Sequence, residues 1–96
     1  MAVVLVHQGP GVTRESYEAV VRSLTGGSRM ESPADWPVEG LLVHAAGEGK
    51  DGFRVIDVWE SEEAARRFGE VLAPHLREAG ITAEPEVYRA HTFVSA

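Results

Sequence analysis

Hydrophobic residues fall along this chain in short runs and helical stripes that predict four strands and two helices. Runs rich in β-branched residues predict strands over residues 2–8, 40–46, 53–60 and 86–94. A stripe of apolar positions at helical spacing follows Thr13 and ends at Gly26, and a second helix begins after Ser61 and ends at Gly80. The whole chain, residues 1–96, is therefore expected to form one domain with the element order βαββαβ.

The connections between these elements differ in length and composition. Residues 47–52 contain three glycines and have the length of a hairpin connection, so the strands on either side should pair antiparallel. Residues 28–38 are rich in proline, serine and acidic residues and show no periodicity, which predicts a long loop. That loop carries Trp36, whose indole needs an apolar place to rest, either as a lid over a cavity or in a contact between subunits.

The element order predicts how the strands assemble. Two βαβ halves joined by a hairpin form a ferredoxin-like sheet when both crossovers are right-handed. The expected fold class is therefore α+β, with a four-stranded antiparallel sheet and both helices on one face. The strands are nevertheless apolar on both faces, as in the continuous run from Val3 to Val6. A sheet with one face in water would alternate apolar and polar residues, so we expect a second layer over the open face, most simply a second copy of the chain.

Composition and charge narrow the classes of partner. Hydrophobic residues make up 44% and charged residues 25% of the chain, as in ordinary globular proteins. The net charge of -6, with scattered basic residues, argues against a nucleic-acid partner. There is no cysteine, which fits a reducing compartment, and no apolar run approaches the roughly 20 residues needed to span a bilayer. We therefore expect a cytoplasmic protein without a membrane partner.

A specific combination of residues surrounds the second helix. The third strand ends in an acidic-x-aromatic sequence, Asp57-Val58-Trp59, a helix follows at once, and Pro74-His75 lies near its far end. In this combination the chain resembles the dimeric α/β-barrel superfamily, in particular its small domains of the antibiotic-biosynthesis-monooxygenase type. The resemblance implies a homodimer whose two sheets pack face to face, with a small-molecule cavity between each sheet and its own helices. The chain departs from the pattern because it lacks a further histidine before Pro74.

The second helix and the hairpin supply the candidate site. Phe68 and His75 are seven residues apart and so share one helix face, and His75 is expected to point inward. A hairpin loop with an even number of residues would pair His44 with Val55. The same sheet face would then carry Leu42, Phe53, Asp57 and Trp59, and the opposite face Leu41, Val43, Ala45, Ile56 and Val58. We assign the first, mixed face to the cavity and the second face to the contact between subunits.

The resemblance suggests roles for these side chains. His75 would be the catalytic acid-base group, with Asp57 or His44 as its orienting partner. The residues expected to contact a substrate are Tyr17, Trp36, Trp59, Phe68 and Leu72. Structural roles compete with these assignments. A carboxylate in mid-strand needs a partner, here His44 or an arginine, and a tryptophan such as Trp59 is more often part of a core than of a binding site.

The histidines also raise the question of a metal site. His7, His44 and His75 would lie near one end of the sheet, whereas His91 would lie near the other end. Imidazoles can bind zinc, yet three separately satisfied histidines are the simpler interpretation. We therefore expect neither a metal ion nor another cofactor.

The function that the resemblance implies is that of a small-molecule enzyme similar to the cofactor-independent monooxygenases, acting on an aromatic or polyketide-like substrate. Two alternatives stay open. One is a non-catalytic homodimeric module for ligand binding or stress response. The other is a haem-binding or haem-degrading protein with His75 as the iron ligand. Motifs of the classical hydrolases are absent from the sequence.

Overall fold

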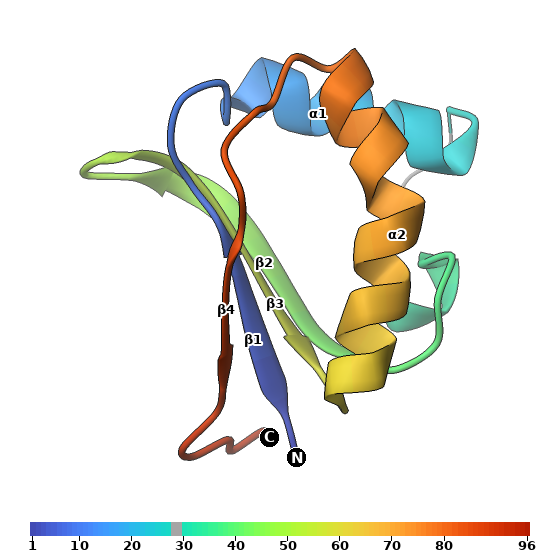
Figure 1. The fold of residues 1–96 in the computed structure, drawn as a ribbon, viewed down its shortest axis with the longest axis vertical. Helices are drawn as coiled ribbons and strands as arrows, with labels where there is room; N and C mark the ends of the chain where they lie inside the picture. The colour runs from blue at the N-terminus through green and yellow to red at the C-terminus, as the bar shows by residue number, and fades with distance from the viewer. Residues whose placement is uncertain (28–29) are drawn as a thin grey trace.

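The order of helices and strands follows the predicted pattern. A computed structural model describes residues 1–27 and 30–96 of the chain. The elements are β1 (Val3–His7), α1 (Arg14–Thr25), the short 3-10 helix η1 (Pro33–Asp35), β2 (Leu41–Gly49), β3 (Gly52–Trp59), α2 (Glu62–Glu78) and β4 (Glu86–Arg89) (Figure 1). This arrangement confirms the predicted order βαββαβ. The first two residues of the loop predicted over 28–38 lie outside the described residues, and η1 occupies part of the remainder.

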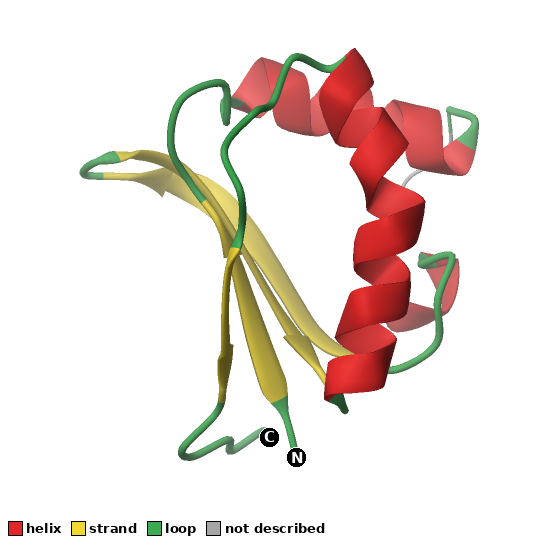
Figure 2. Cartoon of the chain, viewed as in Figure 1, coloured by secondary structure: helices red, strands yellow, loops and turns green. Residues whose placement is uncertain are grey.

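The four strands form one antiparallel sheet in the order β2-β3-β1-β4. Both long helices lie on the same side of this sheet, and the far end of the β2–β3 hairpin curves away from them (Figure 2). The space between the sheet and the helices therefore has a wall of strands on one side and a wall of helices on the other. Neither α1 nor α2, nor any other helix in the part of the chain that is described, is long and apolar enough to cross a membrane.

Side-chain caps begin the helices where the sequence predicts them. The Thr13 hydroxyl accepts a hydrogen bond from the Ser16 backbone N–H at 3.1 Å, and the Ser16 hydroxyl accepts one from the Thr13 N–H at 2.9 Å. The Ser61 hydroxyl accepts from the Ala64 N–H at 3.1 Å at the start of α2. At the end of α1, Gly26 adopts a φ of 68°, a left-handed conformation that glycine adopts without steric cost. These caps fix the direction in which each helix leaves the sheet.

Two strand boundaries differ from the prediction. The β2–β3 ladder continues to the pair Gly49 and Gly52, because the backbone of glycine-rich residues can still form ladder hydrogen bonds. His44 consequently lies opposite Asp57, and the predicted pairing with Val55 was wrong by two residues. The last strand ends at Arg89 instead of continuing to residue 94. It stops there because its neighbour β1 begins at Val3, so the chain beyond Arg89 runs out of a partner strand.

A β-bulge in β2 corrects the predicted face assignment of two leucines. Leu41 pairs with Trp59 and Val43 pairs with Val58, so Leu42 is an extra residue in β2. As a result Leu41 is buried at 7% exposure, whereas Leu42 is 41% exposed, the reverse of the prediction. The remaining alternation survives, because a shift by two residues returns each side chain to the same face.

The hydrophobic core fills most of the space between sheet and helices. Trp59 is fully buried and its ring lies 4.8 Å from that of Phe68, measured between centroids. Val3, Leu5 and Leu41 extend this core across the sheet. The outer face of the sheet is also apolar, and partly exposed side chains on it are Val4, Val6, Val43, Ile56 and Tyr88.

Candidate active site

A small cavity lies between the inner face of the sheet and the two helices. The residues of its lining that carry a polar group are His7, Tyr17, Trp36, His44 and Asp57. Much of the remaining wall is hydrocarbon, including Val12, Val20, Leu24, Phe68, Leu72 and Ile81. The space open to the centre of a water molecule is about 50 Å³, far less than the roughly 300–1,000 Å³ of pockets that hold drug-sized ligands. An aromatic ligand can enter only if side chains at the rim move.

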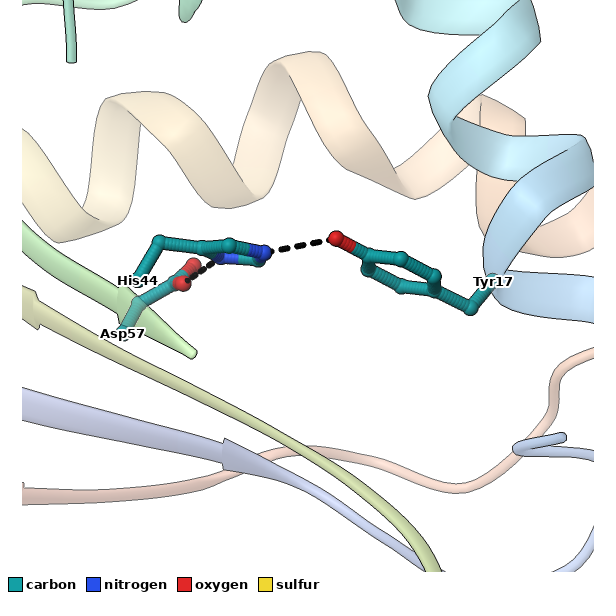
Figure 3. A network of polar contacts seen from close by, with 3 residues as sticks. All are labelled: Tyr17, His44 and Asp57. Atoms are coloured by element: carbon teal, nitrogen blue, oxygen red, sulfur yellow. Dashed lines mark hydrogen bonds and ion pairs between the residues drawn. The ribbon is translucent and has the colours of Figure 1, made fainter. Parts of the chain in front are cut away.

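Three of the lining residues form a continuous hydrogen-bonded network (Figure 3). The Nδ1 atom of His44 lies 2.5 Å from Oδ1 of Asp57, and its Nε2 atom lies 2.7 Å from the hydroxyl oxygen of Tyr17. Asp57 is only 2% exposed, so its carboxylate depends on this partner. We expected Asp57 to pair either with His44 or with an arginine, and in the structure it pairs with His44.

Each member of the network comes from a different element. Tyr17 projects from the second turn of α1, His44 from β2 and Asp57 from the neighbouring strand β3. The register places His44 directly opposite Asp57 on the inner face. The bulge at Leu42 is what allows both Leu41 and His44, three residues apart, to face inward. Without the extra residue, strict alternation would turn one of the two side chains toward the outer face.

The network defines which groups donate protons. A carboxylate only accepts hydrogen bonds, so Nδ1–H of His44 donates to Asp57, and in this tautomer Nε2 accepts from the Tyr17 hydroxyl. Burial, followed by the nearby Asp57 carboxylate, raises the pKa of the Tyr17 phenol above its ordinary value. Tyr17 therefore stays protonated at neutral pH and available as a donor. The arrangement resembles the way an aspartate orients a histidine base toward a hydroxyl in hydrolytic enzymes.

His7 is a cavity residue that the sequence brought forward only as a member of a three-histidine group. It is 8% exposed at the end of β1, and neither ring nitrogen has a hydrogen-bond partner among residues 1–27 and 30–96. Burial lowers the pKa of His7, the Asp57 carboxylate opposes this shift, and His44 adds to it. The signal available in the sequence was its position two residues after Leu5 on the inward-facing side of β1.

Trp36 packs against the His44 ring of the network. Its ring centroid is 4.7 Å from that of His44, and its side chain is buried although it belongs to an irregular segment. We expected this indole either over a cavity or in a contact between subunits, and in the structure it lines the cavity. Oδ2 of Asp35 holds the segment by accepting from the backbone N–H groups of Glu31 and Ser32 at 2.9 and 3.0 Å. These two bonds, in that order, lower the pKa of the Asp35 carboxyl.

The predicted inward orientation of His75 was wrong. His75 is not part of the cavity lining, and its Nδ1 atom lies 2.6 Å from the Ser23 hydroxyl in a link between α2 and α1. The reason is the angle around the helix: Leu72 and Leu76 lie about 40° and 80° from Phe68 in one direction, whereas His75 lies about 20° from it in the other. The inward stripe of α2 consists instead of Phe68, Leu72 and Leu76.

The other predicted contact residues divide between cavity and core. Tyr17, Trp36, Phe68 and Leu72 line the cavity, as do the predicted pair His44 and Asp57. Trp59 does not line the cavity, because it is buried in the core against Phe68 and next to β1.

The structure does not bring the three candidate histidines together in one site. In the described part of the chain, no group of three or more histidine, cysteine, aspartate or glutamate residues is placed to hold a metal ion. His7 and His44 share the cavity, but His75 is engaged with Ser23 outside it. His75 therefore does not fit the expected role of iron ligand for a haem in this cavity.

Comparisons with known proteins bear on the fold. No protein-family model matches the chain, and no curated protein sequence matches it. Among solved structures, a variant of SnoaB, a cofactor-independent oxygenase from Streptomyces nogalater, matches with a TM-score of 0.60 and 17% identity, covering 99% of this chain and 98% of SnoaB. SnoaB itself matches with a TM-score of 0.58 and 18% identity over the same shares of both chains.

A third structure is more distant in shape. It is a monooxygenase from the gene ActVA-Orf6 of Streptomyces coelicolor in complex with nanaomycin D, with a TM-score of 0.44, 25% identity and coverage of 98% of this chain and 91% of that chain. The likeness to SnoaB extends over almost the full length of both proteins. At the level of the fold, the chain is therefore a βαββαβ domain like that of SnoaB.

Proposed function

We propose that this chain is a small-molecule enzyme that oxidises a hydroxylated aromatic, polyketide-like substrate with O2 and without a cofactor. The observation that carries the proposal is the Asp57–His44–Tyr17 network facing an otherwise apolar cavity. SnoaB, a protein with the same fold, is a cofactor-independent oxygenase, which makes this chemistry a natural one to test. The catalytic assignment moves from His75 to His44, because His44 is the histidine that both contacts the cavity and has a carboxylate partner.

The network can remove a proton from a substrate. A substrate whose ring methylene and ring ketone have tautomerised presents an enol hydroxyl to Tyr17, and this enol donates its proton to the phenolic oxygen while the Tyr17 proton passes to Nε2 of His44. Asp57 accepts from Nδ1–H and stabilises the imidazolium that forms. The apolar wall of the cavity keeps water away from the resulting anion and strengthens its interaction with the network.

The oxidation then needs only the substrate anion and O2. The anion transfers one electron to O2, and the substrate radical and superoxide combine into a carbon-bound peroxide. The peroxide takes up the proton held by the network and loses water, which leaves a carbonyl group. The net reaction converts a ring methylene and O2 into a ring ketone and water, so O2 is reduced by four electrons and the substrate supplies all four.

The most direct test is oxygen uptake with dithranol, a dihydroxyanthrone whose ring methylene forms a delocalised anion. We expect the protein to accelerate O2 consumption above the uncatalysed rate and to place one atom of labelled O2 in the product ketone. General-base catalysis contributes typically 10²- to 10⁴-fold, so His44→Ala should lower kcat/KM by about 100-fold or more. Tyr17→Phe should cause a comparable loss because it interrupts the relay.

Two variants serve as controls. His75→Ala removes a histidine of α2 whose side chain does not line the cavity, so the variant should keep the wild-type rate. Asp57→Asn keeps an acceptor oxygen for His44 but loses the negative charge, and should fall between wild type and His44→Ala. Equal losses in His44→Ala and His75→Ala, with both variants folded, would contradict the assignment of the base.

The small free volume of the cavity favours a second candidate, a non-catalytic ligand-binding module. In that case aromatic compounds would bind between sheet and helices, but no tested compound would cause O2 consumption above background. Saturable binding without oxygen uptake would therefore select the binding module over the oxygenase.

A further inference from the structure

His7 stands apart from the proton relay yet shares its cavity. Its side chain is more than nine-tenths buried on the inner face of β1, and both of its ring nitrogens are without a partner among the residues described on either side of the gap at 28–29. Buried polar groups in native proteins are almost always hydrogen-bonded, and an exception calls for an explanation. A ligand group that enters the cavity would supply the missing partner.

We propose that His7 is the specificity-determining residue of this cavity and recognises a second oxygen substituent on an aromatic ligand, a hydroxyl or a ketone. The inference rests on the proposed function only in taking the same cavity as the substrate site. It assigns the ligand class as flat aromatics with at least two oxygen substituents, one for Tyr17 and one for His7.

The chemistry of a neutral imidazole sets the kind of group that it selects. One ring nitrogen donates and the other accepts, so a hydroxyl can use either nitrogen and a ketone can use the donor. Burial keeps His7 neutral by lowering its pKa, and Asp57 lines the same cavity. A carboxylate ligand would gain no ion pair at His7 and would be repelled by Asp57, so we expect neutral oxygen substituents to be preferred.

The sheet register separates His7 from the pair of His44 and Asp57 to which Tyr17 is bound. Leu5 pairs with Asp57 and His7 pairs with Val55, so His7 lies one inward-facing step along β1 from the row that holds Asp57 and His44. Two residues along a strand span about 6.6 Å. Apart from the Tyr17 hydroxyl on α1, the polar groups thus lie along the sheet side of the cavity, and the rest of the helix side is apolar. A flat ring system can lie between these walls with oxygen substituents directed at both polar points.

A binding cycle tests the inference. The ligands are 1,5-dihydroxynaphthalene and 1-naphthol, which differ by one hydroxyl, and their dissociation constants are measured by NMR titration in the absence of O2. The proteins are wild type and His7→Leu, which replaces the imidazole by an apolar side chain of similar size. Since one neutral hydrogen bond contributes modestly, we expect the preference of the wild type for the diol to fall by about 10-fold in His7→Leu.

A second readout separates recognition from a structural role. Adding the diol to the wild type should shift the imidazole ¹⁵N resonances of His7, whereas 1-naphthol should shift them less. His7→Leu should be at least as stable to heat as the wild type, because the variant no longer buries an unpartnered imidazole. His7→Asn, which keeps a donor and an acceptor, should recover part of the preference for the diol.

The outcomes distinguish this inference from the proposed function. A diol preference that is unchanged in His7→Leu, or an absence of binding by either naphthalene at its solubility limit, would overturn the role of His7. His7-dependent binding in a protein that consumes no O2 with dithranol would leave the recognition site intact and reject the oxygenase. Oxygen uptake with dithranol together with an unchanged diol preference in His7→Leu would support the oxygenase and reject the role of His7.

Discussion

Asp57 shows how a single buried charge organises the cavity. Its carboxylate is almost completely enclosed in the middle of β3, where an unpaired charge would be costly. The hydrogen bond to His44 satisfies it, orients the imidazole and leaves Nε2 directed at Tyr17. The sequence allowed the need for a partner to be predicted, because a carboxylate at an inward position of an apolar strand has few alternatives.

Removing this carboxylate should destabilise the protein. In Asp57→Ala the Nδ1–H group of His44 loses its acceptor, and a buried polar group left unpaired costs about 1–3 kcal/mol. We expect a loss of that size in the free energy of unfolding measured by urea denaturation. Asp57→Asn retains an acceptor oxygen and should lose less. If the alanine variant is as stable as wild type, the bond to His44 does not contribute to folding.

His7 should make stability depend on pH. Its pKa is lowered in the folded protein, so below the ordinary value of 6.5 the unfolded chain binds more protons than the folded one. The free energy of unfolding should therefore fall as the pH drops through and below that value. The groups that face His7 are Asp57, which opposes the shift, and His44, which adds to it.

The measurement compares urea denaturation of wild type and His7→Leu at several pH values. The variant lacks this titrating group, so its stability should decline less between neutral and mildly acidic pH. Parallel curves for the two proteins would show that His7 is not responsible.

At the scale of elements, the limits of sequence reasoning are clearest in β2. Its residues Leu41, Leu42 and Val43 are all apolar, so no alternation in the sequence reveals the bulge. The helix stripe was easier to predict, since Phe68 and Leu72 do face the cavity. His75 was misplaced because the side of α2 that lines the cavity turns from Phe68 toward Leu72 and Leu76, away from His75. The exposed outer position of Leu42 and the link from His75 to Ser23 both depend on tertiary contacts.

Gly40 lies just before β2, where a side chain has no room. Its φ is 111°, and a Cβ atom there would lie 2.8 Å from Cβ of Ala64 at the start of α2. Gly40→Ala should therefore destabilise the fold by about 1–3 kcal/mol through backbone strain and this clash. Gly47→Ala is the matched control, because a Cβ atom at Gly47 meets no atom within 4 Å in the described structure. Equal urea midpoints for the two variants would contradict the close approach of Gly40 to α2.

The Trp36 segment should loosen when its Asp35 anchor is removed. Asp35→Ala deletes the acceptor for two backbone N–H groups, those of Glu31 and Ser32. We expect faster hydrogen exchange of the Ser32 amide, measured by NMR, with little change in the strands. Asp51→Ala, at the tip of the β2–β3 hairpin, should leave that exchange rate unaltered. An unchanged rate in Asp35→Ala would show that other contacts hold the segment.

At the scale of the whole molecule, the sheet topology was predictable because element order and chirality leave few alternatives. The cavity was predictable in part: the residue types and their faces follow from alternation, whereas its small volume follows from how Trp36 and the helices pack. The sequence contained no signal for that packing.

The apolar outer face of the sheet predicts self-association. Val4, Val6 and Ile56 remain partly exposed there, and Tyr88 is nearly half exposed. We expect sedimentation at micromolar concentration to give twice the 10.4 kDa mass of one chain. Val6→Glu should shift the protein toward the monomer, since it places a further charge on that face. A wild-type protein that sediments as a monomer would contradict a dimer through the sheet.

The site itself is tested most directly by a crystal structure of the protein soaked anaerobically with 1,5-dihydroxynaphthalene. We expect the ring system between the sheet and the helices, with Trp36 displaced, one hydroxyl within hydrogen-bond distance of Tyr17 and the other within reach of His7. A ligand bound only on the outer sheet face, or in the groove between α2 and β4, with the Asp57–His44–Tyr17 cavity still closed, would contradict the assignment of this cavity as the functional site.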